Sequence, residues 1–249
     1  MEFTYDAYFR FLDELRSAGY RVRGFDGPGE RTNPHDQVVL LRHDVDLDLD
    51  RAVALARLEH EHGIASSYFF LLTSPFYNPA SASGRERVRA IAALGHTVGL
   101  HFDATVHGAV DDPAEFNRRC TGEAEQLEAI SAAPVHAVSF HRPPSLLVGG
   151  NAELTAPRVH TYLPHYVQEM EYCTDSTGAW RYGPPDERPA VARGEALHFL
   201  THPVWWGEEA VPPGARLRAL LDDRAAQART DVAAELQVPL ATAPPDTTR

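Results

Sequence analysis

Lysine is absent from the 249 residues, and all 23 basic residues are arginine. A Schiff-base lysine, a covalently held pyridoxal phosphate and a Walker A phosphate loop each need a lysine amine, so these classes are excluded. Acidic residues are in excess, and the formal net charge is −12. Binding to nucleic acid or to an anionic membrane needs clustered positive charge, so we expect neither partner.

Cysteine is scarce, and long apolar runs are missing. Cys120 and Cys173 are the only two cysteines, which excludes a disulfide framework and an all-cysteine zinc site. No stretch approaches the roughly 18 consecutive apolar residues that span a membrane. The N-terminus shows no basic segment followed by an apolar one, as a secretory signal would. We therefore expect a cytoplasmic protein with two reduced thiols.

Helix and strand patterns alternate along the chain. Strands are predicted at 37–41, 66–72, 97–102, 135–140 and 196–201, with weaker candidates at 158–162 and 169–174. Helices are predicted at 5–18, 50–62, 84–94, 112–132 and 213–236. Alternation of this kind is typical of an α/β fold with a parallel sheet. With no repeat and no linker, we expect one domain over residues 1–249 that ends in a frayed tail at 240–249.

Polar residues gather where predicted strands end. The clusters are His43-Asp44-Val45-Asp46, His101-Phe102-Asp103, His141-Arg142, Asp175 and His202. The carboxyl ends of parallel strands share one face, so these segments should converge on one pocket. Imidazoles and carboxylates bind zinc and similar divalent ions and also perform acid–base catalysis. The pattern favours metal-assisted hydrolysis.

Different chemistry at these residues finds less support. Asp48 and Asp50 continue the alternation of aspartates and are expected to cap the following helix. An EF-hand is excluded, because neither Asp44 nor Asp46 as the first position places glycine sixth and glutamate twelfth. No Gly-x-Ser-x-Gly elbow occurs, and no histidine lies near either cysteine in sequence, so acyl-enzyme chemistry lacks support.

Five segments within residues 38–203 carry a resemblance. They are Leu40–Asp46 followed by Tyr68–Phe70, Gly95–His101, Phe140–Pro144, Tyr172–Ser176 and Leu200–Pro203. In this order they resemble the motifs of the polysaccharide deacetylase (NodB-homology) superfamily, which includes carbohydrate esterase family 4. The resemblance implies a distorted (β/α)7 barrel of the NodB type and metal-dependent removal of an acyl group from an amide nitrogen.

The resemblance also implies roles for individual residues. Asp44 would be the general base and His202 the general acid that protonates the leaving amine. Arg142 would orient the Asp44 carboxylate through a bidentate contact. Asp46 and His101 would be metal ligands. Substrate contacts are expected from Asp175 and from Trp205-Trp206, whose rings would stack on a sugar or, alternatively, pack in the core.

One position departs from the family pattern. The common second motif has another histidine four residues after the first, and here that residue is Thr105. His141 is the preferred third ligand, because it lies at a predicted strand end beside the pocket. Asp103 and His107 are the competitors.

The function predicted from the sequence is a divalent-metal hydrolase, most simply a zinc enzyme. It would remove an acetyl or similar acyl group from the amide nitrogen of a small sugar-containing metabolite. A cyclic amide or ureide hydrolase of the same fold is the first alternative. A non-catalytic relative that binds a ligand without turnover is the second, suggested by Thr105.

Overall fold

The computed structural model describes residues 1–26, 32–108, 112–143 and 150–237. The chain divides into two compact units, Met1–Ala210 and Val211–Arg249. In the second unit the described residues form helix α6 (Pro213–Leu236), with the bounds that the sequence predicted. The tail predicted at 240–249 and Pro144 of the third motif lie outside the described residues, and the single domain over 1–249 stays a prediction.

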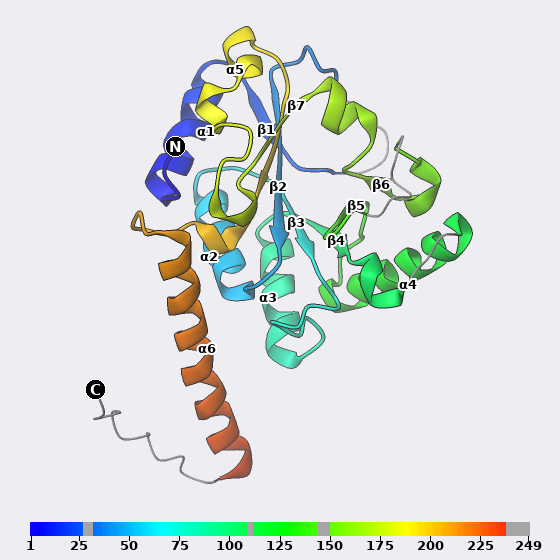
Figure 1. The fold of residues 1–249 in the computed structure, drawn as a ribbon, viewed down its shortest axis with the longest axis vertical. Helices are drawn as coiled ribbons and strands as arrows, with labels where there is room; N and C mark the ends of the chain where they lie inside the picture. The colour runs from blue at the N-terminus through cyan, green and yellow to red at the C-terminus, as the bar shows by residue number, and fades with distance from the viewer. Residues whose placement is uncertain (27–31, 109–111, 144–149, 238–249) are drawn as a thin grey trace. The chain divides into compact units, whose positions relative to one another are not determined.

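The first unit is built on a parallel sheet (Figure 1). Its strands are β1 (Arg21–Arg23), β2 (Val38–Val45), β3 (Ser67–Phe70), β4 (Thr97–Phe102), β5 (Ala137–Phe140), β6 (Val159–His160), β7 (Glu171–Thr174) and β8 (Leu197–Thr201). Their order is β6-β5-β4-β3-β2-β8-β7, and β1 pairs with β2 outside this path. Every pairing is parallel, as the alternation of helices and strands predicted.

The sheet is curled into an open barrel. Strands β2 and β6 are separated by β3, β4 and β5, which in a flat sheet would place them about 19 Å apart. Yet the Arg42 guanidinium on β2 donates a hydrogen bond to the hydroxyl of Thr161, directly after β6. The contact crosses the interior, so the seven strands from β2 to β8 enclose it. The expected distorted (β/α)7 barrel is confirmed.

Helices cover the outer face of the barrel. They are α1 (Tyr5–Ser17), α2 (Leu49–Glu61), α3 (Ala82–Ala93), α4 (Pro113–Ser131) and the short α5 (Pro189–Arg193). Helix α3 packs between α2 and α4 (Figure 1). Side chains cap the starts: Thr4 accepts from Ala7 N, and Asp48 accepts from Asp50 N and Arg51 N. The predicted cap at Asp48 is thereby confirmed, whereas Asp50 lies in the first turn and pairs with Arg87.

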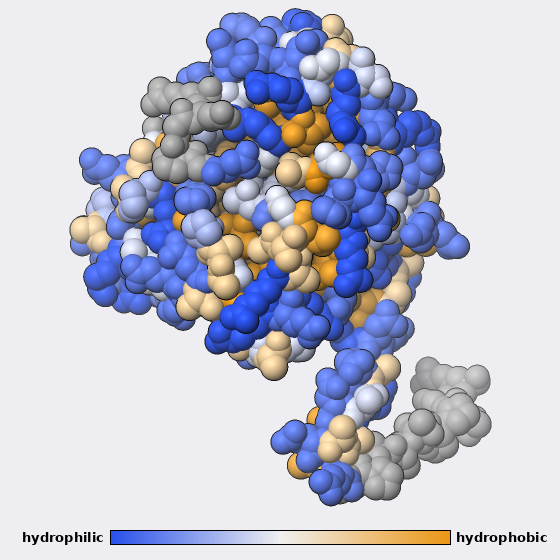
Figure 2. Space-filling model, turned by 180° about the vertical axis from the view of Figure 1, so that it is seen from behind, coloured by the Kyte–Doolittle hydropathy of each residue, from blue (hydrophilic) through white to orange (hydrophobic). Residues whose placement is uncertain are grey.

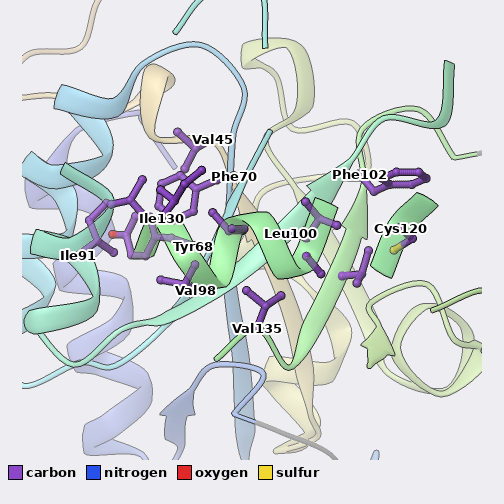
Figure 3. Packing of buried hydrophobic residues seen from close by; sticks show 14 of the residues in the cluster. Val45, Tyr68, Phe70, Ile91, Val98, Leu100, Phe102, Cys120, Ile130 and Val135 are labelled. Carbon is purple, nitrogen blue, oxygen red and sulfur yellow. The ribbon is translucent and has the colours of Figure 1, made fainter. Parts of the chain in front are cut away.

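Two apolar clusters pack against the sheet, one on each face. The larger fills the space between the strands and helices α2, α3 and α4, and includes Tyr68, Phe70, Ile91 and Leu100 (Figure 3). The smaller lies on the other face of the strands and includes Leu40, Phe69, Tyr166 and Met170. The face of the molecule in Figure 2 is mostly hydrophilic, and its hydrophobic residues show mainly in hollows.

Several elements differ from the predictions, among them β2, β1 and α5. Strand β2 continues to Val45, although it was expected to end before Arg42-His43-Asp44. Strand β1 and helix α5 were not predicted, because three and five residues are too few for a recognisable period. Among the described residues, no helix has the length and apolarity to cross a membrane.

Candidate metal centre and hydrolytic site

Strand β2 brings the first polar cluster to the barrel interior. Side chains alternate along a strand, so Arg42 and Asp44 share one face, and Asp46 follows directly after the strand. His43 points to the opposite face, where its Nε2 lies 2.9 Å from Glu59 Oε1 on α2. The expectation that His43 belongs to the pocket is wrong for this reason.

Three ligand atoms converge at the carboxyl ends of β2, β4 and β5. Asp46 Oδ1 lies 3.1 Å from His101 Nε2 and 3.3 Å from His141 Nδ1, and the two nitrogens are 3.3 Å apart. Asp46 Oδ1 is buried and makes no hydrogen bond of good geometry with either ring. One carboxylate oxygen and two imidazole nitrogens that face one another form a donor set suited to a zinc-like divalent ion.

The tautomer of His101 follows from its other neighbour. Ser139 Oγ donates to Asp44 Oδ1 at 3.2 Å and lies 2.5 Å from His101 Nδ1. The single hydroxyl hydrogen is used on Asp44, so Ser139 accepts from Nδ1–H of His101. When the ring is neutral, the lone pair of His101 Nε2 therefore faces Asp46 and can bind a cation.

Charge holds the two aspartates ionised. Burial opposes ionisation of Asp44, but Arg42 outweighs it, and the pKa of Asp44 lies below its ordinary value. Burial likewise opposes ionisation of Asp46, but His101 and His141, in their protonated forms, hold the pKa of Asp46 well below its usual range. The ionised Asp44 carboxylate lies beside the ligand atoms, with its Oδ2 3.8 Å from His101 Nε2.

The arginine that holds Asp44 is Arg42, not Arg142. Arg42 Nε donates to Asp44 Oδ1 at 3.2 Å and Arg42 Nη2 donates to Oδ2 at 2.8 Å, with both side chains buried. The side chain of Arg142 is 66% exposed and lies 3.6 Å from Asp103. Arg142 follows β5 at the rim, whereas Arg42 lies two residues before Asp44 on the same face of β2. The role expected for Arg142 is corrected accordingly.

A third histidine, His202, faces the ligand atoms from the end of β8. His202 Nδ1 lies 2.6 Å from Asp175 Oδ1, and His202 Nε2 lies 3.8 Å from Asp46 Oδ2. Burial lowers the pKa of His202, but the Asp175 carboxylate outweighs it and raises the pKa of His202 to about 9. The imidazole is therefore a proton donor near neutral pH, with Nε2 turned toward the site.

Asp175 and the two tryptophans do not form a substrate surface. Asp175 is fully buried and accepts from the His202 backbone N–H at 3.0 Å and from Trp206 Nε1 at 2.9 Å. Trp206 has no exposed surface, and Trp205 is 8% exposed. The expectation of substrate contact at these residues is wrong. Asp175 bonds to the His202 ring and to Trp206 on the side away from the ligand atoms, and both tryptophans pack in the core.

The competitors for third ligand lie elsewhere. Asp103 Oδ1 accepts from the backbone and hydroxyl of Thr105 at the start of a short 3-10 helix. His107 Nε2 lies 2.6 Å from Glu123 Oε1. Each is committed to its own partner, whereas His141 joins Asp46 and His101.

Similarity to known proteins is found in solved structures. No family model and no curated protein matches the chain. The matching structures include a CE4 family pseudoenzyme of Bacillus anthracis, at 15% identity and a TM-score of 0.45, covering 68% of this chain and 56% of that one.

Two further matches come from other organisms. The chitin deacetylase of Colletotrichum lindemuthianum has 14% identity and a TM-score of 0.46, with 78% of this chain and 84% of that chain covered. A putative polysaccharide deacetylase of Mycobacterium smegmatis has 13% identity and a TM-score of 0.46, with 88% and 98% covered. The chain spans 56% to 65% of the length of the three pseudoenzyme structures, and the case for its chemistry rests on its own residues.

Proposed function

We propose that the chain is a divalent-metal-dependent amide hydrolase that removes an acyl group, most simply acetyl, from an amide nitrogen. The observation that supports it most is the convergence of Asp46, His101 and His141 beside one ionised carboxylate and one protonated imidazole. Hydrolysis of an amide needs a polarised carbonyl, a base for water and an acid for the leaving nitrogen.

The chain's residues divide these tasks. Asp46 Oδ1, His101 Nε2 and His141 Nδ1 would hold the ion, for which zinc suits the mixed nitrogen and oxygen donors. When bound, such an ion polarises the acyl carbonyl and lowers the pKa of a water molecule toward about 7. Asp44 takes the proton from the attacking water, and Arg42 keeps its carboxylate ionised and oriented.

His202 completes the reaction at the leaving nitrogen. Its Nδ1–H is held by Asp175, so its Nε2–H is available to the departing amine. An alkyl amine leaves poorly without a proton, and this donor therefore distinguishes amide hydrolysis from ester hydrolysis. The substrate we propose is an N-acetylated sugar derivative of low molecular weight.

The test is an assay of acyl release on a matched panel. Acetamido monosaccharides, their oligomers and cyclic ureides are incubated with protein that has been stripped with a chelator and then resupplied with zinc. We expect acetate release from the acetamido monosaccharides only after zinc is restored. Turnover of ureides alone would replace the proposed reaction with cyclic amide hydrolysis, and no turnover of any compound would support a ligand-binding relative.

A further inference from the structure

Arg42 connects the proposed base, Asp44, to Thr161 on the opposite side of the barrel. Thr161 follows β6, is fully buried, and has its backbone N–H bonded to Val138 O at 2.9 Å. Its hydroxyl accepts from Arg42 Nη1. The guanidinium also lies over the ring of Tyr162, with 5.3 Å between Cζ and the ring centroid.

These contacts leave Arg42 little rotational freedom. Nη1 is tied to Thr161, while Nε and Nη2 are tied to the two oxygens of Asp44. A guanidinium is planar, so fixing its outer nitrogen on one side fixes the plane of the carboxylate on the other. Loss of the Thr161 contact would let that plane turn without removing any charge.

The orientation of Asp44 decides which oxygen is available to water. Oδ1 accepts from both Arg42 Nε and Ser139 Oγ, each at 3.2 Å. Oδ2 accepts from Arg42 Nη2 and faces His101. A turned carboxylate would present the wrong oxygen to the ligand cluster.

We propose that Thr161 is a positioning residue for the base Asp44 and acts on it through Arg42. The proposal rests on the function proposed above, in which Asp44 takes the proton from water. It assigns a kinetic role to a residue on the opposite wall that touches neither the ligand cluster nor the base.

The hydroxyl of Thr161 is tested by three variants. Thr161→Val is isosteric and removes the hydroxyl, whereas Thr161→Ser keeps it. Thr155→Val is the matched control, because Thr155 is also buried and its hydroxyl donates to Arg158 O at 2.8 Å, outside the site.

We expect Thr161→Val to lower kcat about tenfold with KM and zinc content unchanged, since small misplacements of a reacting group are costly. Thr161→Ser should restore kcat to within about twofold, and Thr155→Val should reduce only the melting temperature.

A double-mutant cycle separates positioning from general loosening. In an Asp44→Asn background, Thr161→Val should cause no further loss of kcat, because the group that it positions is gone. A further tenfold loss in that background, failure of Thr161→Ser to restore the rate, or an equal loss in Thr155→Val would overturn the proposal. Failure of the proposed function is a different result, in which Asp44→Asn alone leaves kcat near that of the unsubstituted protein.

Discussion

At the scale of single residues, His202 carries the most specific chemical claim. Its Nδ1 is occupied by Asp175, and its Nε2 faces the ligand cluster. A histidine at the end of β8 could act as the general acid, bind the metal as a fourth ligand or serve only to pack the core. These three roles predict different results when the ring is removed.

We expect His202→Ala to reduce kcat about 10²–10⁴-fold on an alkyl amide and far less on an activated aryl ester, whose leaving group needs no proton. Zinc content should not change. His35→Ala, which removes an imidazole whose side chain is 81% exposed, is the control. Loss of zinc, or an equal loss of rate on both substrates, would assign His202 to another role.

Asp175 sets the pH range in which His202 stays protonated. Its carboxylate raises the pKa of His202 to about 9, so the acid is present below that pH and lost as pH rises through it. Asp175→Asn should move the basic limb of the kcat/KM profile toward the ordinary histidine pKa of about 6.5. Trp206→Phe keeps the carboxylate and should leave that limb nearer to pH 9. A limb that stays in place in Asp175→Asn would show that another group controls it.

Not all of these residues were predictable from the sequence. Asp44, Asp46, His101, His141 and His202 were predicted at strand ends, and the structure brings them together. Arg42 was missed, although the alternation that places Asp44 and Asp46 on one face also includes position 42. The resemblance directed the prediction to Arg142 instead, and a linear motif does not reveal which of two arginines reaches a carboxylate in a curled sheet.

At the scale of elements, strand β2 and helix α2 are joined by a buried carboxylate. Glu59 has no exposed surface, and its oxygens accept from Tyr8, Ser66 and Tyr68 and lie beside His43. Burial alone would raise the pKa of Glu59, but its imidazole and hydroxyl neighbours outweigh burial and lower the pKa to about 2. Because α2 packs behind β2, this network holds the strand that carries Asp44.

Breaking this network should weaken folding rather than chemistry. Glu59→Gln should lower the free energy of unfolding by about 3 kcal/mol at neutral pH, as expected when one partner of a buried polar network is removed. The folded pKa of Glu59 is depressed, so its contribution is present above its ordinary pKa of 4.5 and is lost as pH falls toward 2. Chemical denaturation at pH 7 and pH 3 measures both effects.

The control for Glu59→Gln is Glu86→Gln, on the exposed side of α3. It should change the free energy of unfolding by less than about 0.5 kcal/mol at either pH. A Glu59 variant that is as stable as the control would show that the buried carboxylate does not hold β2 to α2.

The same residues show why the end of β2 was predicted wrongly. Arg42, His43 and Asp44 are polar, and the apolar run that predicts the strand ends before them. Each is nevertheless buried within the strand, because Arg42 pairs with Asp44 and His43 with Glu59. Strand β4 has a single ionisable residue, His101, which is the last but one in the strand. The apolar run therefore covers almost the whole strand, and its predicted bounds match the observed ones, Thr97–Phe102.

At the scale of the whole molecule, the sheet order creates the site. The proposed ligands come from the ends of β2, β4 and β5, and the proposed acid, His202, follows β8, which neighbours β2 on its other side. A parallel sheet places these ends on one face, which is why a pattern of polar residues at strand ends predicted a site before any contact was known. The position of the third ligand depends on loop geometry, so the sequence favoured His141 but kept Asp103 and His107 as competitors.

The most direct test of the proposed metal centre is the zinc stoichiometry of the purified protein and its ligand variants, each dialysed against zinc and then freed of unbound ion. We expect one ion per chain, lost in Asp46→Ala, His101→Ala and His141→Ala but retained in His107→Ala and Asp103→Asn. Binding should also raise the melting temperature, because the ion binds only the folded chain tightly. Absence of zinc from the unsubstituted protein, or full retention in His141→Ala, would contradict the metal centre on which the proposed hydrolysis depends.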